Sequence, residues 1–106
     1  MKGMGGGGMQ ALMRQANQMQ NKMKKLQEEF LSREFEGTSG GGAVKIVALG
    51  SYQLKSIDIN PEAMDDQEML QDLILTATNE VMKKVKTTYE EEMSKVTGGF
   101  SMPGMF

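Results

Sequence analysis

The sequence predicts an α+β fold in which a long N-terminal helix, a three-stranded antiparallel β-meander and a long C-terminal helix follow one another. Three observations predict it: an apolar stripe of helical period before position 31, two β-branched runs between positions 44 and 59, and a second helical stripe beyond position 69. With 106 residues in all, we expect a single domain over residues 9–99. We expect residues 1–8 to be a flexible Gly/Met-rich leader and residues 100–106 to be a flexible or docked tail.

The first helix is predicted over residues 9–30, which contain neither Gly nor Pro. Its apolar residues are separated alternately by three and four positions, the spacing of a heptad stripe. We expect this stripe to pack as a seam: Met9, Leu12, Ala16, Met19, Met23, Leu26 and Phe30.

The meander is predicted to begin at Arg33–Glu36, followed by a loop over Gly37–Gly42. The second strand is expected over 44–49 and the third over 52–59. Gly50-Ser51 between them is typical of a two-residue hairpin turn, which would pair Val47 with Leu54 and Ile46 with Lys55. Both faces of such a sheet are partly apolar, so we expect a cover on each side.

The second helix follows two capping signals. Asn60-Pro61 can open a helical turn, and Asp65 with Glu68 has the spacing of a capping box. The helix is expected to continue to Gly98-Gly99. Its apolar stripe comprises Leu70, Leu73, Ile74, Ala77, Val81, Val85 and Tyr89.

Composition argues against several classes of function. Cys and His are both absent, which removes thiol nucleophiles, imidazole bases and the metal sites built from them. No apolar run approaches the ~18 residues of a membrane span. We therefore expect a cytoplasmic protein that is not an enzyme, has no metal or other cofactor, and binds neither a membrane nor a small-molecule substrate.

Charge is unevenly distributed along the chain, although the formal net charge is only −2. Residues 1–27 contain five basic residues and no acidic one, while residues 60–80 contain six acidic residues and no basic one. Lysines crowd two helical turns, at 22–25 and 83–86. The residues alone leave two interpretations open: solubility with pairs such as Glu80–Lys84, or contacts to the phosphates of DNA.

Two helices of this length cannot lie within one small globule, since ~25 residues at ~1.5 Å each span about 37 Å. A compact chain of this size has a radius of gyration of only ~13 Å. The helices must therefore protrude and leave apolar stripes that need a partner. A homodimer is the simplest arrangement that supplies one.

Several segments resemble, in their order and spacing, one bacterial family. They are Leu-Met-Arg-Gln-Ala-Asn-Gln-Met-Gln at 12–20, Lys-Met-Lys-Lys-Leu-Gln-Glu-Glu at 22–29, Ile-Asp-Ile-Asn-Pro at 57–61, the acidic opening of the last helix at 66–73, and Gly-Gly-Phe-Ser-Met-Pro-Gly-Met-Phe at 98–106. The chain resembles the YbaB/EbfC family of nucleoid-associated proteins over essentially its whole length.

The resemblance implies a tweezer-like homodimer that binds duplex DNA in the nucleoid and alters its conformation, with a role in nucleoid organisation and gene regulation. Binding is expected to have low sequence selectivity and to rely on phosphate contacts. The basic residues of the projecting helices would make these contacts: Arg14, Lys22, Lys24, Lys25, Lys83, Lys84 and Lys86.

An alternative from another class rests on the twelve methionines. Met side chains are flexible and occur on surfaces that bind varied polypeptides. The alternative function is therefore a Met-rich coiled-coil adaptor or chaperone-like protein.

Overall fold

The computed structural model describes the backbone of residues 2–97 and the side chains from Gly8 onward. It confirms the predicted fold class: a long helix, three antiparallel strands and a second long helix. Short 3₁₀ turns at Gly40–Gly42 and Pro61–Asp65 join the elements. The main elements are α1 (Lys2–Leu31), β1 (Glu34–Ser39), β2 (Val44–Leu49), β3 (Leu54–Ile59) and α2 (Gln67–Val96).

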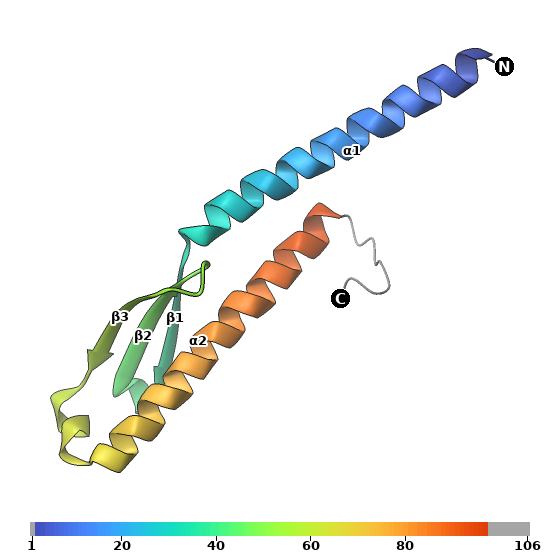
Figure 1. Cartoon of the computed structure of the whole chain (residues 1–106). Helices are drawn as coiled ribbons and strands as arrows, with labels where there is room; N and C mark the ends of the chain where they lie inside the picture. The colour runs from blue at the N-terminus through green and yellow to red at the C-terminus, as the bar shows by residue number, and fades with distance from the viewer. Residues whose placement is uncertain (1, 98–106) are drawn as a thin grey trace.

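The molecule is strongly elongated, with extents of 78 × 24 × 17 Å and a radius of gyration of 21.0 Å. A compact chain of this length would have a radius of gyration near 13 Å. Figure 1 shows the reason: α2 lies along the sheet and continues past it, whereas α1 leaves the sheet and projects from one end. The predicted protrusion of the helices is therefore present in the single chain.

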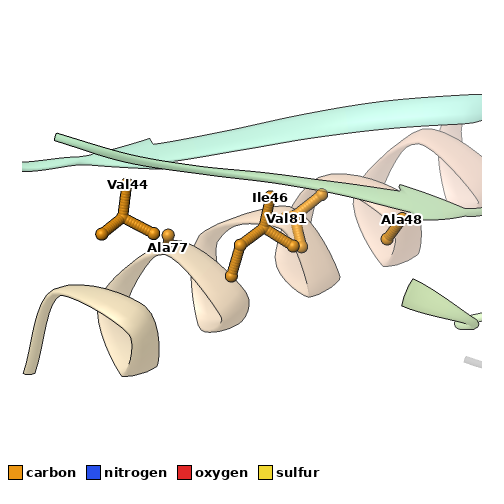
Figure 2. Close-up of a cluster of buried hydrophobic side chains, with 5 residues drawn as sticks. All are labelled: Val44, Ile46, Ala48, Ala77 and Val81. Atoms are coloured by element: carbon orange, nitrogen blue, oxygen red, sulfur yellow. The ribbon is translucent and has the colours of Figure 1, made fainter. Parts of the chain in front are cut away.

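The core lies between α2 and one face of the sheet. The strands are in the order β1-β2-β3, and the central strand turns Val44, Ile46 and Ala48 toward the helix. Figure 2 shows these side chains meeting Ala77 and Val81 of α2. The predicted α2 stripe is confirmed, with Ala77 and Val81 fully buried. Small and β-branched residues allow the helix to lie close to the pleated surface.

The other face of the sheet is not covered by any described segment and is largely polar. Lys55 pairs with Glu34 there, and Lys45 lies 3.9 Å from Glu36. The expectation that each face has a cover is therefore wrong within the single chain. These exposed ion pairs each contribute at most ~1 kcal/mol, so they keep the face soluble rather than hold the sheet together.

The first strand is longer than the sequence predicted, because it continues through Gly37 to Ser39. The sequence predicts a loop from Gly37 onward. An added Cβ at Gly37 would lie 2.6 Å from the Ala77 carbonyl oxygen and 2.8 Å from the Val81 Cβ. A glycine is thus needed at position 37 because α2 packs directly against β1. It does not mark a turn.

The β2–β3 connection also differs from the prediction. Leu49 N–H donates to the Gln53 carbonyl at 2.8 Å, so the loop contains four residues, 50–53, where two were expected. Ile46 consequently pairs with Ile57, and the register is displaced by two residues. Because side chains alternate with a period of two, Ile57 keeps its predicted face. A shift in register between Val47 and Ala48 pairs Leu54 with Ala48, so Leu54 and Lys55 lie on the faces opposite to those predicted.

The start of α1 lies seven residues before the predicted one, at Lys2 where Met9 was expected. Glycine is a poor helix former but does not forbid helical backbone, so the Gly-rich segment extends the helix. The predicted start at Met9 was wrong; that residues 1–8 are flexible stays a prediction. The predicted tail, 100–106, lies outside the described residues.

The cap of α2 is Asp66, one residue after the predicted Asp65. Its Oδ1 accepts a hydrogen bond from Met69 N–H at 3.1 Å. The Asn60-Pro61 signal is confirmed, since Asn60 accepts from Glu62 N–H at 3.1 Å and Pro61 begins the 3₁₀ turn. Asp65 is the last residue of this 3₁₀ turn. Asp66 is therefore the extended residue directly before the helix, where an N-cap stands.

An aromatic cluster fixes the base of α1. The Phe30 ring packs 5.3 Å from Phe35 of β1 and 5.2 Å from Tyr89 of α2, measured between centroids. Arg33 lies over both phenylalanine rings and pairs with Glu92 of α2. The direction in which α1 leaves the sheet is set mainly at this cluster.

Candidate nucleic-acid interface

All seven basic residues predicted as DNA contacts are exposed. Arg14 lies in the middle of α1, and Lys22, Lys24 and Lys25 lie nearer its C-terminal end. Lys83, Lys84 and Lys86 lie on α2. Helices position all of them, so their mutual placement follows from helical geometry.

On α1, three of the four basic residues share one side. At about 100° per residue, Arg14, Lys22 and Lys25 fall within ~80° of one another, while Lys24 lies on a flank about 80–160° from them. We call the side that carries Arg14, Lys22 and Lys25 the α1 basic face. It covers roughly 16 Å of helix, since eleven residues separate its ends and each rises ~1.5 Å.

Arg14 and Lys25 lie about 140–160° around the helix from Phe30, whereas Lys22 lies ~80° from it, at the edge of the apolar stripe. Phe30 is buried against the rest of the molecule, and Met23 and Leu26 are half-buried. Because these three residues face α2, Arg14 and Lys25 point away from it and Lys22 lies at the flank.

No acidic residue occurs between positions 8 and 27, but the exposed Glu28 and Glu29 follow. Glu29 lies one helical turn from Lys25 on the same side, so the positive charge of this face is offset at its C-terminal end.

The lysines of α2 have different surroundings. Lys84 Nζ donates to the Glu36 carbonyl oxygen at 2.7 Å and lies 3.5 Å from Glu80, so it is held against β1. Lys86 borders a cavity between α2 and α1, together with Glu90. Lys83 points away from the sheet, about 160° around the helix from Val81. Lys83 and Lys86 lie ~60° apart around the helix, so the lysine cluster read from the sequence is divided between two directions, with Lys84 in the other.

The two predicted clusters do not converge on one surface of the single chain. The α1 basic face is directed away from α2, whereas Lys84 and Lys86 flank the buried side of α2. The α1 cluster groups three exposed basic residues on one side, and acidic residues follow it only at Glu28 and Glu29. It is therefore the stronger candidate for binding a polyanion.

Two amide side chains on α1 were missed by the sequence reading. Gln18 and Asn21 lie between Arg14 and Lys25 and share the α1 basic face. Asn and Gln side chains commonly donate hydrogen bonds to DNA phosphates. The signal that could have revealed them is helical spacing, because positions 14, 18, 21 and 25 are separated by four, three and four residues. Lys95, exposed in the last turn of α2, was also left out.

The remaining basic residues between Gly8 and Thr97, where side chains are described, have structural partners. Arg33 pairs with Glu92, Lys45 with Glu36, and Lys55 with Glu34. Over residues 2–97, no three acidic side chains gather where they could hold a metal ion. No helix in this range is long and apolar enough to span a membrane.

Residues 4–100 match the model of the YbaB/EbfC DNA-binding family. The chain belongs to this family. Among curated relatives, it is 48% identical over 104 residues to a nucleoid-associated protein of Caldanaerobacter subterraneus subsp. tengcongensis, covering 96% of this chain and 94% of the relative. It is 50% identical over 103 residues to a nucleoid-associated protein of Pelotomaculum thermopropionicum, covering 95% and 98%.

The fold is also found in a solved structure. The crystal structure of an uncharacterized protein from Helicobacter pylori matches 73% of this chain and 92% of its own, with a TM-score of 0.63 and 23% identity. This likeness concerns the fold alone. The YbaB/EbfC membership identifies a DNA-binding, nucleoid-associated family, which is not a class of enzymes.

Proposed function

We propose that the protein binds duplex DNA as a homodimer in the cytoplasm, within the nucleoid, and contacts phosphates mainly through the α1 basic face. Lys24 adds charge on a flank of this face and Lys83 and Lys86 add charge on a separate surface of α2, while Lys84 is engaged with β1. In a dimer, two projecting helices would hold DNA at two places. Such binding changes the path of the duplex and would contribute to nucleoid organisation and gene regulation.

The observation that carries this proposal is the exposed basic face of α1, with no acidic residue between positions 8 and 27, in a chain of a DNA-binding family. The acidic total of the protein does not oppose it, because salt screens charges beyond ~8–10 Å. The acidic segment around residues 62–72 lies at the opposite end of α2 from α1, as Figure 1 shows.

Binding of this kind should be weakly selective for sequence. Lys is a point charge that reaches phosphate, whereas base readout relies on paired Arg, Asn or Gln side chains inserted in a groove. The α1 basic face contains one arginine and no aromatic residue, and its two amide side chains, Gln18 and Asn21, stand among lysines that reach only phosphate. Any preference among DNA sequences would then arise from shape and deformability.

The salt dependence of DNA binding tests the proposal. A dimer that neutralises about six phosphates should show a slope near −5 when log affinity is plotted against log salt, since each phosphate contributes ~0.9. Fluorescence anisotropy with a labelled duplex at several salt concentrations measures this slope.

A matched pair of variants locates the site. Lys22→Gln with Lys25→Gln should flatten the slope by about 3.6, because four lysines of the dimer are removed at ~0.9 each. Lys45→Gln with Lys55→Gln changes the net charge equally but acts on the ion-paired sheet face, so its slope should stay near the parent value. An unchanged slope in the first variant would exclude the α1 basic face.

The adaptor function is favoured by one observation only. Met9, Leu12 and Met13 are each more than 60% exposed, and they line part of α1 as a flexible apolar surface. The adaptor function would replace DNA binding if the parent protein binds no DNA at low salt and does bind unfolded polypeptides.

A further inference from the structure

A cavity of about 510 Å³ lies between α1, the β2–β3 hairpin and the C-terminal half of α2. Met23 of α1, Tyr52 of the hairpin, and Tyr89 and Met93 of α2 contribute its apolar walls. A second cavity of about 460 Å³, at the base of α1, also borders Gln27, Tyr52 and Tyr89. We call the first of these the interhelix cavity.

The interhelix cavity opens where the described chain ends. Thr97, the last described residue, is part of its lining. Nine residues follow, Gly-Gly-Phe-Ser-Met-Pro-Gly-Met-Phe, and none of them is charged. Four are large and apolar, and a phenylalanine alone carries ~150–250 Å² that is favourable to bury.

The length and composition of this segment fit the cavity. Phe100 is three residues beyond Thr97, a reach of at most ~10 Å. Gly98-Gly99 can adopt the left-handed backbone with which helices commonly end, so the chain can reverse direction there. In an extended segment Phe100 and Met102 share one side, and Ser101 faces the other.

We propose that residues 98–106 dock into the interhelix cavity of their own chain, with Phe100 inserted between Met23 and Met93. The tether favours this occupant over the same segment of an unassociated molecule. A short flexible linker gives a tethered group an effective concentration in the millimolar range, far above that of a free molecule at micromolar protein. A mixed sample separates this occupant from the tail of a dimer partner.

Docking would add a link between the two helices at a point where they share few others. Gln27 Nε2 donates to the Tyr89 hydroxyl at 3.1 Å, and Phe30 is the only buried residue of the described part of α1. A side chain held between Met23 and Met93 would restrain the direction of α1. It would therefore set how the α1 basic face is presented.

Methyl NMR of the full chain with ¹³C-methyl methionine tests the docking. We expect nuclear Overhauser contacts from the Phe100 ring to the methyl groups of Met23 and Met93. Phe100→Ala should remove these contacts and the ring-current shift of both methyls. The methyl of Met64, which is 63% exposed in the turn before α2, should stay in place and serves as an internal reference.

Ser101→Ala is the matched control and should leave the Met23 and Met93 methyl resonances unchanged. Slower amide exchange of residues 19–27 in the parent than in Phe100→Ala, with equal exchange in β2, would support the added link. Unmoved Met23 and Met93 resonances in Phe100→Ala would overturn the proposal.

A mixed sample separates docking within the chain from docking between chains. Labelled Phe100→Ala protein is combined with unlabelled parent protein, so any contact from a Phe100 ring to a labelled methionine must come from another molecule. We expect no such contact. Its detection would overturn the proposal and assign the cavity to the tail of a second copy.

Discussion

At the scale of single residues, two glycines determine how closely the elements approach one another. Gly37 allows β1 to lie against Ala77 and Val81 of α2. Gly50 lies against the backbone and ring of Phe30, and its N–H donates to the Arg33 carbonyl oxygen at 2.9 Å. Both positions are close contacts that any side chain would disturb.

Gly37→Ala and Gly50→Ala should each lower the free energy of unfolding by ~1–3 kcal/mol, the usual cost of overpacking, because the new methyl group meets backbone atoms. Gly8→Ala is the control, since a Cβ there has nothing within 4 Å. It should raise helix stability by at most ~1 kcal/mol. Urea denaturation at one protein concentration measures all three; two neutral results at 37 and 50 would contradict the packing described.

At the scale of elements, α1 and α2 have similar apolar periodicity but very different burial. The stripe of α2 meets the sheet, and Ala77, Val81 and Val85 are completely inaccessible. On α1 only Phe30 is buried, while Leu12 is 63% exposed. A regular stripe therefore indicates a helix and its apolar side. It does not indicate which other element, if any, covers that side.

Phe30→Ala should destabilise the protein by ~3–5 kcal/mol, because it removes a buried ring that contacts both Phe35 and Tyr89. Lys24→Ala, exposed on the same helix, should change the stability by less than ~0.5 kcal/mol. Thermal unfolding followed by circular dichroism distinguishes them. Equal losses in the two variants would show that the aromatic cluster does not anchor α1.

At the scale of the whole molecule, the sheet is wider than the helix that covers it. α2 packs on β1 and β2, and the inner side of the edge strand β3 is left open, with Leu54 and Ile57 exposed. An open edge with apolar residues favours association. This surface and the exposed stripe of α1 support the proposed homodimer.

Sedimentation at micromolar concentration should give a mass about twice 11.7 kDa. Ile57→Asp should shift the protein toward the monomer, since it places a charge on the apolar inner side of β3. Ser56→Asp is the matched control on the outer side of the same strand, opposite Val47, and should remain dimeric. A parent protein that is monomeric throughout this range would refute the dimer.

The candidate site was predictable to a limited extent. Counting charges along the chain was enough to find the basic residues, and helical spacing already groups Arg14, Lys22 and Lys25. The sequence could not show that Lys84 is held by Glu36 of β1, because 48 residues separate the partners. Contacts over such distances depend on how the helix and sheet are packed.

The sequence by itself determined the type, order and apolar sides of the elements, because periodicity, β-branching and capping act over a few neighbouring residues. Only the tertiary structure decided that Gly37 belongs to a strand, that the β2–β3 loop has four residues, and that α1 stands away from the core. The first two depend on distant partners. Gly37 packs against Ala77 and Val81, and Gly50 of the β2–β3 loop packs against Phe30 at the base of α1. Local preferences permit several outcomes at such positions, and packing between remote segments selects one.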